Sequence, residues 1–319
     1  MLLKEVFLAL PTLMRSKLSS RVQLESLLGG HFSWPRTDRG TAGPEVILTG
    51  IRQLDETFGG IWRGALTEIT GPVSSGRTSL LLSVLTTLTR KQEVCALVDA
   101  NDMFDPESAA AAGVELERLL WVRCDGNPQQ QRPTGRPHKS SAKARGMERL
   151  EQAFKAADFI LQSKGFGMVV LDLAALPPEL VHRVPLTSWF RFRRVVENTE
   201  TALLVLEQEP HAKTCASLVL QLQPGQSKWD SSVPSVSPES PRPSHTFLLR
   251  GLGSEVNVLR WRGSHDQCRF NSHPRLCFEV HTEWSGQPAQ TTGRRTYVEE
   301  PFLSSAESAA VASRGFLEA

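Results

Sequence analysis

The stretch that decides the fold is Gly71-Pro72-Val73-Ser74-Ser75-Gly76-Arg77-Thr78-Ser79-Leu80. An apolar segment typical of a buried strand, 65–70, precedes it, and apolar residues recur at helical spacing over 78–90. The glycine spacing fits G-x-x-x-x-G-K-[ST], in which backbone N–H groups surround a phosphate at the N-terminus of a helix. The sequence therefore predicts a strand, a phosphate-binding loop and a helix in succession.

Position 77 departs from this motif, because Arg77 stands where the motif has lysine. A guanidinium is a wider, planar group with a different hydrogen-bonding geometry, so the exchange is not neutral. The loop therefore predicts nucleotide binding and argues against efficient hydrolysis. The alternative is a retained turn that packs the sheet while Arg77 itself fills the phosphate site. The loop residues predicted to bind nucleotide are Gly71, Ser74, Ser75, Gly76, Arg77, Thr78 and Ser79.

Apolar segments alternate with helical patterns through residues 46–223, which predicts an α/β fold with a mostly parallel sheet. Strands are expected at 94–98, 119–122, 168–171, 202–206 and 218–222. Ligands of such sheets bind beyond the carboxyl ends of the strands. Thr78 would hold Mg²⁺ directly and Asp172 would hold it through water. The alternative is that Asp172 only caps the next turn.

Composition divides the chain into five segments. They are a helical arm and linker (1–45), the α/β core (46–223), a Ser/Pro-rich linker (224–245), an antiparallel β element (246–284) and a disordered tail (285–319). Within the core, residues 126–146 carry five Lys or Arg and no acid, which predicts a disordered insertion. The insertion is either a solvated linker or a sequence-independent contact to DNA phosphates. The candidate DNA contacts are Arg132, Arg136, Lys139, Lys143 and Arg145.

The bulk composition is that of a globular protein, with 40% hydrophobic residues, 22% charged residues and a formal net charge of +2. This overall charge does not indicate a nucleic-acid partner. The five cysteines include no C-x-x-C pair, which argues against a zinc site and predicts reduced thiols in the cytoplasm. We expect no membrane span, because no run reaches the roughly 20 apolar residues that a span needs.

Two segments, 47–82 and 98–123, together resemble the core of RecA-family recombinases, and the resemblance extends more loosely over 46–223. The wording Gly-Ala-Leu-Thr-Glu-Ile at 64–69 is closer still to ImuA-type proteins, the RecA-like partners of an error-prone translesion polymerase. The resemblance implies a RecA-like P-loop NTPase core, an N-terminal helical arm and a small C-terminal antiparallel β element. It also implies a role in DNA repair and the SOS response, with ATP and Mg²⁺ as cofactors.

The chain differs from the RecA pattern at positions that carry its chemistry. The family's catalytic Glu falls on Asn101, and an amide cannot act as a general base, a loss typically worth about 10²–10⁴ in rate. Gln208 matches the Gln that senses the γ-phosphate. Asp105 matches an adenine contact, but Ser108 replaces the aromatic residue expected nearby. Both DNA-binding loops, expected over 177–188 and after Gln208, are shortened.

These joint changes favour a catalytically impaired accessory factor of translesion synthesis over a recombinase. By resemblance, its partner would be a Y-family-like polymerase subunit, with RecA recombinase, DNA and further copies of this chain as additional partners. One alternative is an active DNA-dependent ATPase or recombinase that uses Asp102 as its base. A second alternative is a structural interaction protein that binds no nucleotide.

Overall fold

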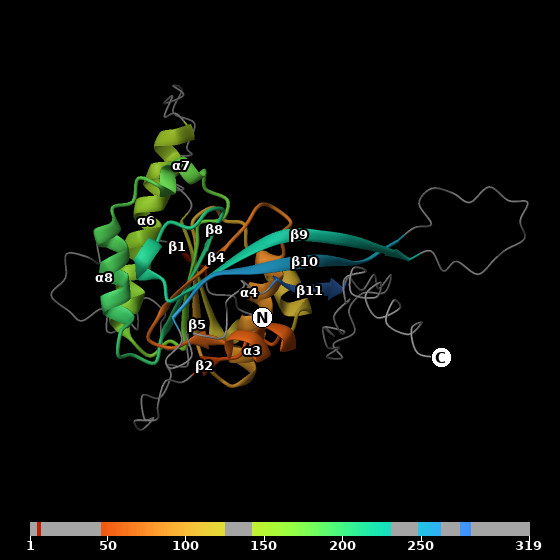
Figure 1. Cartoon of the computed structure of the whole chain (residues 1–319). Coiled ribbons are helices and arrows are strands. Elements are labelled where there is room, and N and C mark those ends of the chain that lie inside the picture. Colours follow the sequence, from red (N-terminus) through yellow and green to blue (C-terminus); the bar gives the residue numbers. More distant parts are fainter. Residues whose placement is uncertain (1–4, 8–45, 125–141, 231–247, 263–274, 282–319) are drawn as a thin grey trace, which may run out of the picture.

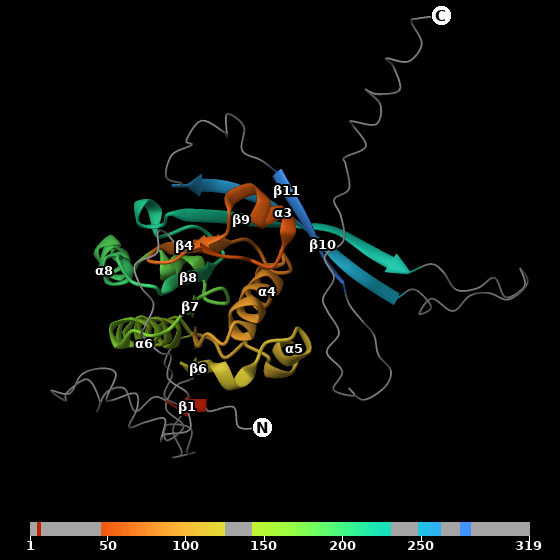
Figure 2. The same cartoon turned by 90° about the horizontal axis from the view of Figure 1, so that it is seen from below.

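The computed structural model describes residues 5–7, 46–124, 142–230, 248–262 and 275–281 (Figure 1). These residues form a nine-stranded sheet in the order β1-β6-β5-β7-β8-β4-β9-β10-β11, and a separate two-stranded sheet, β2-β3. Helices cover both faces of the large sheet. Figures 1 and 2 show α6 and α8 on one face and α4 on the other. The expected α/β core with a mostly parallel sheet is confirmed.

Seven neighbouring strands of the large sheet run parallel. In sheet order they are β1 (Glu5–Phe7), β6 (Leu119–Arg123), β5 (Cys95–Asp99), β7 (Met168–Asp172), β8 (Ala202–Glu207), β4 (Leu66–Thr70) and β9 (Leu218–Asp230). The sheet continues antiparallel through β10 (Leu248–Trp261) and β11 (Arg275–His281). The small sheet pairs β2 (Val46–Ile47) with β3 (Ile61–Trp62).

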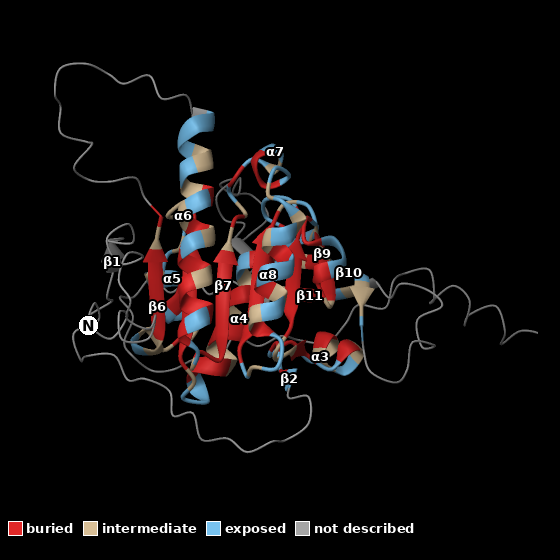
Figure 3. Ribbon diagram, turned by 90° about the vertical axis from the view of Figure 1, so that its left-hand side faces the viewer, coloured by how far each residue is buried: buried red, intermediate tan, exposed pale blue. Residues whose placement is uncertain are grey.

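The helices alternate with these strands along the chain, and each of them buries apolar side chains. They are α3 (Arg52–Phe58), α4 (Arg77–Arg90), α5 (Pro106–Ala111), α6 (Ala142–Ser163), α7 (Pro178–Val181) and α8 (Leu186–Val196), with single 3-10 turns at Leu116–Arg118 and Lys213–Cys215. The central strands are buried on both faces, as Figure 3 shows. Their unbroken apolar runs follow from this position, because neither face is left for polar side chains.

Aromatic packing fixes α8 against α6. Trp189, Phe192 and Val196 are buried at helical spacing. The ring of Phe154 from α6 lies 5.1 Å from the ring of Trp189 and 5.2 Å from that of Phe192, measured between centroids. Phe190 lies on the outward side and stays 45% exposed.

Three expectations about segment boundaries are wrong. Glu5–Phe7 forms a strand rather than part of a helical arm, because it pairs with β6, which would otherwise expose a row of unpaired backbone groups. Residues 142–146 begin α6 rather than end a disordered insertion. β9 runs to Asp230, beyond the expected end of the core at 223, because it pairs with β10 along this length.

β10 is a single long strand within the antiparallel β element expected over 246–284. Register shifts at Leu249/Gly251 and Leu252/Ser254 absorb its glycines without ending the pairing. The rest of the predicted arm, insertion, linker and tail lies outside the described residues.

Replacing Phe192 with alanine removes a fully buried ring from between α6 and the sheet. We expect Phe192→Ala to lower the free energy of unfolding by about 3–5 kcal/mol. Phe190→Ala is the matched control, and its effect should stay within about 0.5 kcal/mol because that ring faces solvent. Urea unfolding followed by circular dichroism measures both. Equal losses in the two variants would contradict this placement of α8.

Candidate nucleotide site

The predicted phosphate loop connects β4 to α4, and its two glycines have the backbone geometry that the motif requires. Gly71 has φ 149° and Gly76 has φ 90°, which L side chains rarely adopt. A side chain at Gly71 would also meet the carbonyl oxygen of Leu222, and one at Gly76 would meet Ser254. The second contact places the loop directly against β10.

The structure brings the predicted loop ligands together. Ser74 and Thr78 are exposed, Ser79 is partly exposed and Ser75 is buried. Ser75 Oγ has no hydrogen-bond partner among the described residues. The Gly71 N–H donates to the carbonyl of Gln208 at 3.1 Å, so the start of the loop is tied to the end of β8.

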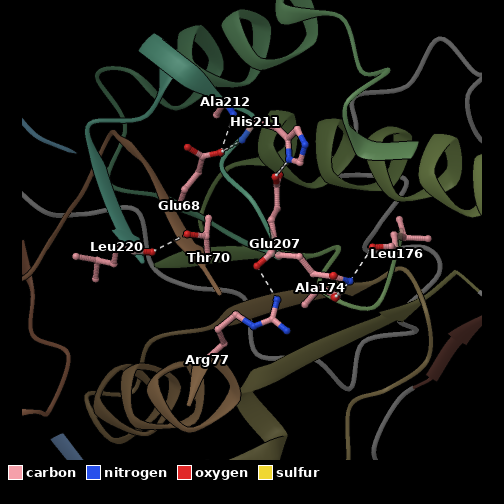
Figure 4. Close-up of polar contacts among 10 residues, drawn as sticks. Glu68, Thr70, Arg77, Ala174, Leu176, Glu207, His211, Ala212 and Leu220 are labelled. Atoms are coloured by element: carbon pink, nitrogen blue, oxygen red, sulfur yellow. Dashed lines mark hydrogen bonds and ion pairs between the residues drawn. The ribbon is translucent and has the colours of Figure 1, made fainter. Parts of the chain in front are cut away.

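Arg77 lies in this loop but its guanidinium binds the protein. Arg77 is 8% exposed, and its Nη1 donates to the backbone carbonyl of Glu207 at 2.6 Å. Figure 4 shows the side chain directed at the end of β8. Burial lowers the pKa of the guanidinium, and the charge of Asp172 opposes that shift. This contact agrees with the alternative interpretation, in which the loop is a retained turn and Arg77 packs within the protein.

Asp172 ends β7 beside β5 and β8, at the carboxyl edge of the sheet. Its Oδ1 accepts a hydrogen bond from the Ala174 N–H at 2.9 Å, which is the turn-capping contact of the alternative interpretation. Burial raises the pKa of Asp172 to about 6, while the charge of Arg77 opposes the rise. Thr78 and Asp172 therefore fit a magnesium ion poorly, because burial favours the neutral form of the Asp172 carboxyl group and the positive charge of Arg77 lies near it. Magnesium binding here stays a prediction.

Gln208 and Asn101, at the sensor and catalytic positions of the resemblance, flank the same edge. Gln208 Nε2 donates to the carbonyls of Ala174 at 3.0 Å and Leu176 at 3.1 Å (Figure 4). Its amide therefore joins the end of β8 to the loop after β7. Asn101 follows β5, and its buried Nδ2 has no hydrogen-bond partner among the described residues.

Three other carboxylates near this edge have structural partners. Asp99 accepts from the Phe104 N–H at 2.9 Å and from Trp121 Nε1 at 3.3 Å. Asp102 forms an ion pair with Arg123. Asp105 caps α5, where hydrogen bonds from Ser108 lower its pKa. None of these interactions tests the predicted contact of Asp105 with adenine.

Sequence reasoning missed a buried acidic cluster, defined here as Glu68, Glu207 and His211. Glu68 Oε1 accepts from the backbone N–H groups of His211 at 2.8 Å and Ala212 at 2.6 Å (Figure 4). Glu207 Oε2 lies 2.6 Å from His211 Nδ1. A charged residue inside the apolar strand 65–70 and the i, i+4 spacing of Glu207 and His211 were the available signals.

Burial determines the protonation of the acidic cluster. It raises the pKa of Glu207 to about 7, against an opposing hydrogen bond from His211, and it raises the pKa of Glu68. Burial alone would lower the pKa of His211, but the hydrogen bond and charge of Glu207 raise it. Glu68 Oε2 and Glu207 Oε1 are buried and have no hydrogen-bond partner among the described residues. This favours a proton on the carboxyl groups of Glu68 and Glu207.

Comparison with known proteins agrees with this geometry. Residues 36–132 match the model of the RecA N-terminal domain. Over this stretch the chain is similar to the RecA N-terminal domain. "Protein RecA" of Ectopseudomonas oleovorans is 36% identical over 138 residues, which cover 42% of this chain and 33% of that protein. The chain thus spans only about a third of that relative's length.

The predicted DNA contacts lie at the edge of the core or outside the described residues. Lys143 and Arg145 are exposed in the first turns of α6, whereas Arg132, Arg136 and Lys139 lie outside the described residues. Within the described ranges, no group of three His, Cys, Asp or Glu could hold a metal, and no helix is long and apolar enough to cross a membrane. Cys95 and Cys215 are buried in the core.

The raised pKa of Glu207 predicts that stability depends on pH. Between about pH 4.5 and 7 the folded state keeps a proton that the unfolded chain releases. Its contribution to stability is therefore complete below about pH 4.5 and is lost as the pH rises through about 7. The raised pKa values of Glu68 and His211 act in the same direction.

Glu207→Gln removes this proton-linked contribution. We expect the free energy of unfolding of the wild type to fall by on the order of 2–3 kcal/mol more than that of the variant between about pH 4.5 and 8. Urea unfolding across this range measures the difference. Parallel pH profiles would mean that Glu207 is ionised in the folded protein throughout.

Proposed function

We propose that this protein is a catalytically impaired RecA-like accessory factor in DNA-damage tolerance, similar to ImuA-type proteins. It docks onto a Y-family-like translesion polymerase subunit and does not turn over ATP at an appreciable rate. DNA, RecA recombinase and further copies of the chain are its other proposed partners. The proposed role belongs to the SOS response. The proposed location of the protein is the cytoplasm.

The observation that carries this proposal is the contact between Arg77 and the carbonyl of Glu207. A phosphate loop that supports turnover needs a cation free to follow the γ-phosphate. Here the guanidinium is buried, and leaving Glu207 would unpair the carbonyl at the end of β8. The loop keeps the shape for holding a nucleotide, so binding of ATP without turnover is part of the proposal.

Two further observations support the loss of ATP hydrolysis. Asn101 has no carboxylate with which to take a proton from water. The side-chain amide of Gln208, the sensor of the resemblance, donates to the carbonyls of Ala174 and Leu176. A sensor held this way has to break two hydrogen bonds before it contacts a phosphate.

The active-ATPase alternative requires Asp102 as the base. The ion pair between Asp102 and Arg123 opposes that role, because both carboxylate oxygens accept from the guanidinium. A base engaged in this way must lose its partner before it can bind the attacking water.

Steady-state ATP turnover with single-stranded DNA tests the proposal. With RecA of Ectopseudomonas oleovorans assayed alongside, we expect turnover by this protein to be at least about 10²-fold lower, the range for loss of a general base. Turnover within tenfold of that enzyme, abolished by Asp102→Ala, would instead establish the active-ATPase alternative.

Polymerase docking is measured separately, by titrating the purified translesion polymerase subunit from the same source into the full chain in a calorimeter. Saturable binding is expected. Failure to bind the subunit, together with no turnover and no thermal shift with Mg-ATP, would favour the structural alternative.

A further inference from the structure

Basic side chains from three segments gather at the amino edge of the sheet, and we call this set the basic corner. Its members are Arg193 of α8, Lys213 of the second 3-10 turn, Arg260 at the end of β10 and Arg262 directly after it. Trp261 of β10 lies opposite Leu218 of β9, which pairs with Thr67 near the start of β4. The basic corner therefore lies at the opposite end of β4 from the phosphate loop.

Backbone and side-chain contacts hold these segments together. The Arg260 guanidinium donates to the carbonyl of Lys213, and the Arg262 N–H donates to the carbonyl of Ser217 at 2.9 Å. Burial raises the pKa of the Cys215 thiol, and the charges of the three arginines of the basic corner oppose that rise. The three guanidinium groups thus lie close to one point. Figure 2 shows α8, the end of β10 and the start of β9 on the same side of the molecule.

Acidic side chains do not neutralise the basic corner within the described residues. None of its four members forms an ion pair there. Glu68 lies nearby but is buried, and its Oε1 accepts from the N–H groups of His211 and Ala212. Glu197 follows Arg193 by one helical turn without forming an ion pair in the same part of the chain. The basic corner therefore carries positive charge that a ligand can neutralise.

Exposed apolar side chains border the basic corner. Phe190 is 45% exposed and precedes Arg193 by three residues, which makes the two side chains neighbours on the surface of α8. Leu259 directly precedes Arg260 at a register shift of β10, and it is 42% exposed. Apolar and aromatic side chains next to arginine are enriched at contacts between proteins.

We propose that the basic corner docks an acidic segment of a protein partner, whose carboxylates bind the arginines and whose apolar side chain contacts Phe190. A guanidinium can bind a carboxylate through two parallel hydrogen bonds. A nucleic-acid backbone is typically bound by a longer basic groove or stripe, whereas these cations form one compact cluster beside apolar side chains. The proposal depends neither on the role in translesion synthesis nor on nucleotide binding.

The test is a fluorescence-anisotropy titration of a labelled oligoglutamate peptide, carrying one central leucine, with the full chain at low salt. We expect Arg193→Gln/Arg262→Gln to weaken binding at least about fivefold, within the range for the loss of two exposed ion pairs. Neither side chain forms a hydrogen bond or ion pair within the described residues, so urea unfolding of this variant should match that of the wild type.

Lys91→Gln/Lys164→Gln is the matched control. It removes the same charge from exposed positions at the same edge of the sheet, before β5 and β7, and it should bind the peptide as the wild type does. An oligoglutamine peptide with the same leucine lacks the carboxylates and should not bind. Phe190→Ala should weaken binding of the leucine-containing peptide and leave binding of plain oligoglutamate unchanged.

The contrary outcomes are distinct. Equal affinities of the wild type and the Arg193/Arg262 variant, or equal losses in the variant and its control, would overturn the proposal. Absence of oligoglutamate binding by the wild type would also overturn it, while leaving polymerase docking intact. Labelled oligothymidylate that binds more tightly and displaces the peptide would assign the basic corner to nucleic acid. A wild-type dimer in sedimentation that the variant does not form would assign it to a second copy of the chain.

Discussion

The buried hydrogen bond from Arg77 to the carbonyl of Glu207 joins the start of α4 to the end of β8. It lies where the phosphate loop, β7 and β8 meet, and the other polar contacts of this edge are arranged around it. The Gly71 N–H donates to the next carbonyl along the chain, that of Gln208. Two successive carbonyls, at the end of β8 and directly after it, therefore hold the loop. A buried, charge-assisted hydrogen bond of this kind is expensive to break without a replacement partner.

This contact connects the phosphate loop to the buried acidic cluster. The carbonyl of Glu207 faces Arg77, while its carboxyl group faces His211. Glu68, on the neighbouring strand β4, holds the backbone of His211 and Ala212. Movement of Arg77 would therefore shift the short segment after Gln208. The resemblance places a DNA-binding loop in this segment. Hydrogen bonds to Glu68 and the contact of Glu207 with His211 therefore hold the segment that follows Gln208 against the sheet.

Most of the core could be predicted from the sequence because its strands and the phosphate loop are specified by neighbouring residues. Fully apolar strands such as β5 and β8, and the glycines at 71 and 76, signal their structure in short windows. The resemblance predicted that Arg77, Asn101 and Gln208 stand at functional positions. It could not show that Arg77 binds Glu207, because that contact depends on the start of α4 and the end of β8 meeting in space.

The errors share the same cause. Glu5–Phe7 is a strand only because β6 needs a neighbour, and β9 reaches Asp230 only because β10 pairs with it. The start of α6 has too few apolar residues to predict a helix, yet Gly146 packs against α7. The acidic cluster was missed because Glu68 is buried by partners from a segment far along the chain.

The most direct test of the central role of Arg77 is the urea unfolding of the wild type and Arg77→Lys, each with and without Mg-ATP. An ammonium lacks the planar fork that reaches the Glu207 carbonyl, so Arg77→Lys should be less stable without nucleotide, by about 1–3 kcal/mol. Mg-ATP should stabilise the variant more than the wild type. If Arg77→Lys is as stable as the wild type without nucleotide and Mg-ATP stabilises the wild type more, then Arg77 is a phosphate ligand and this account is contradicted.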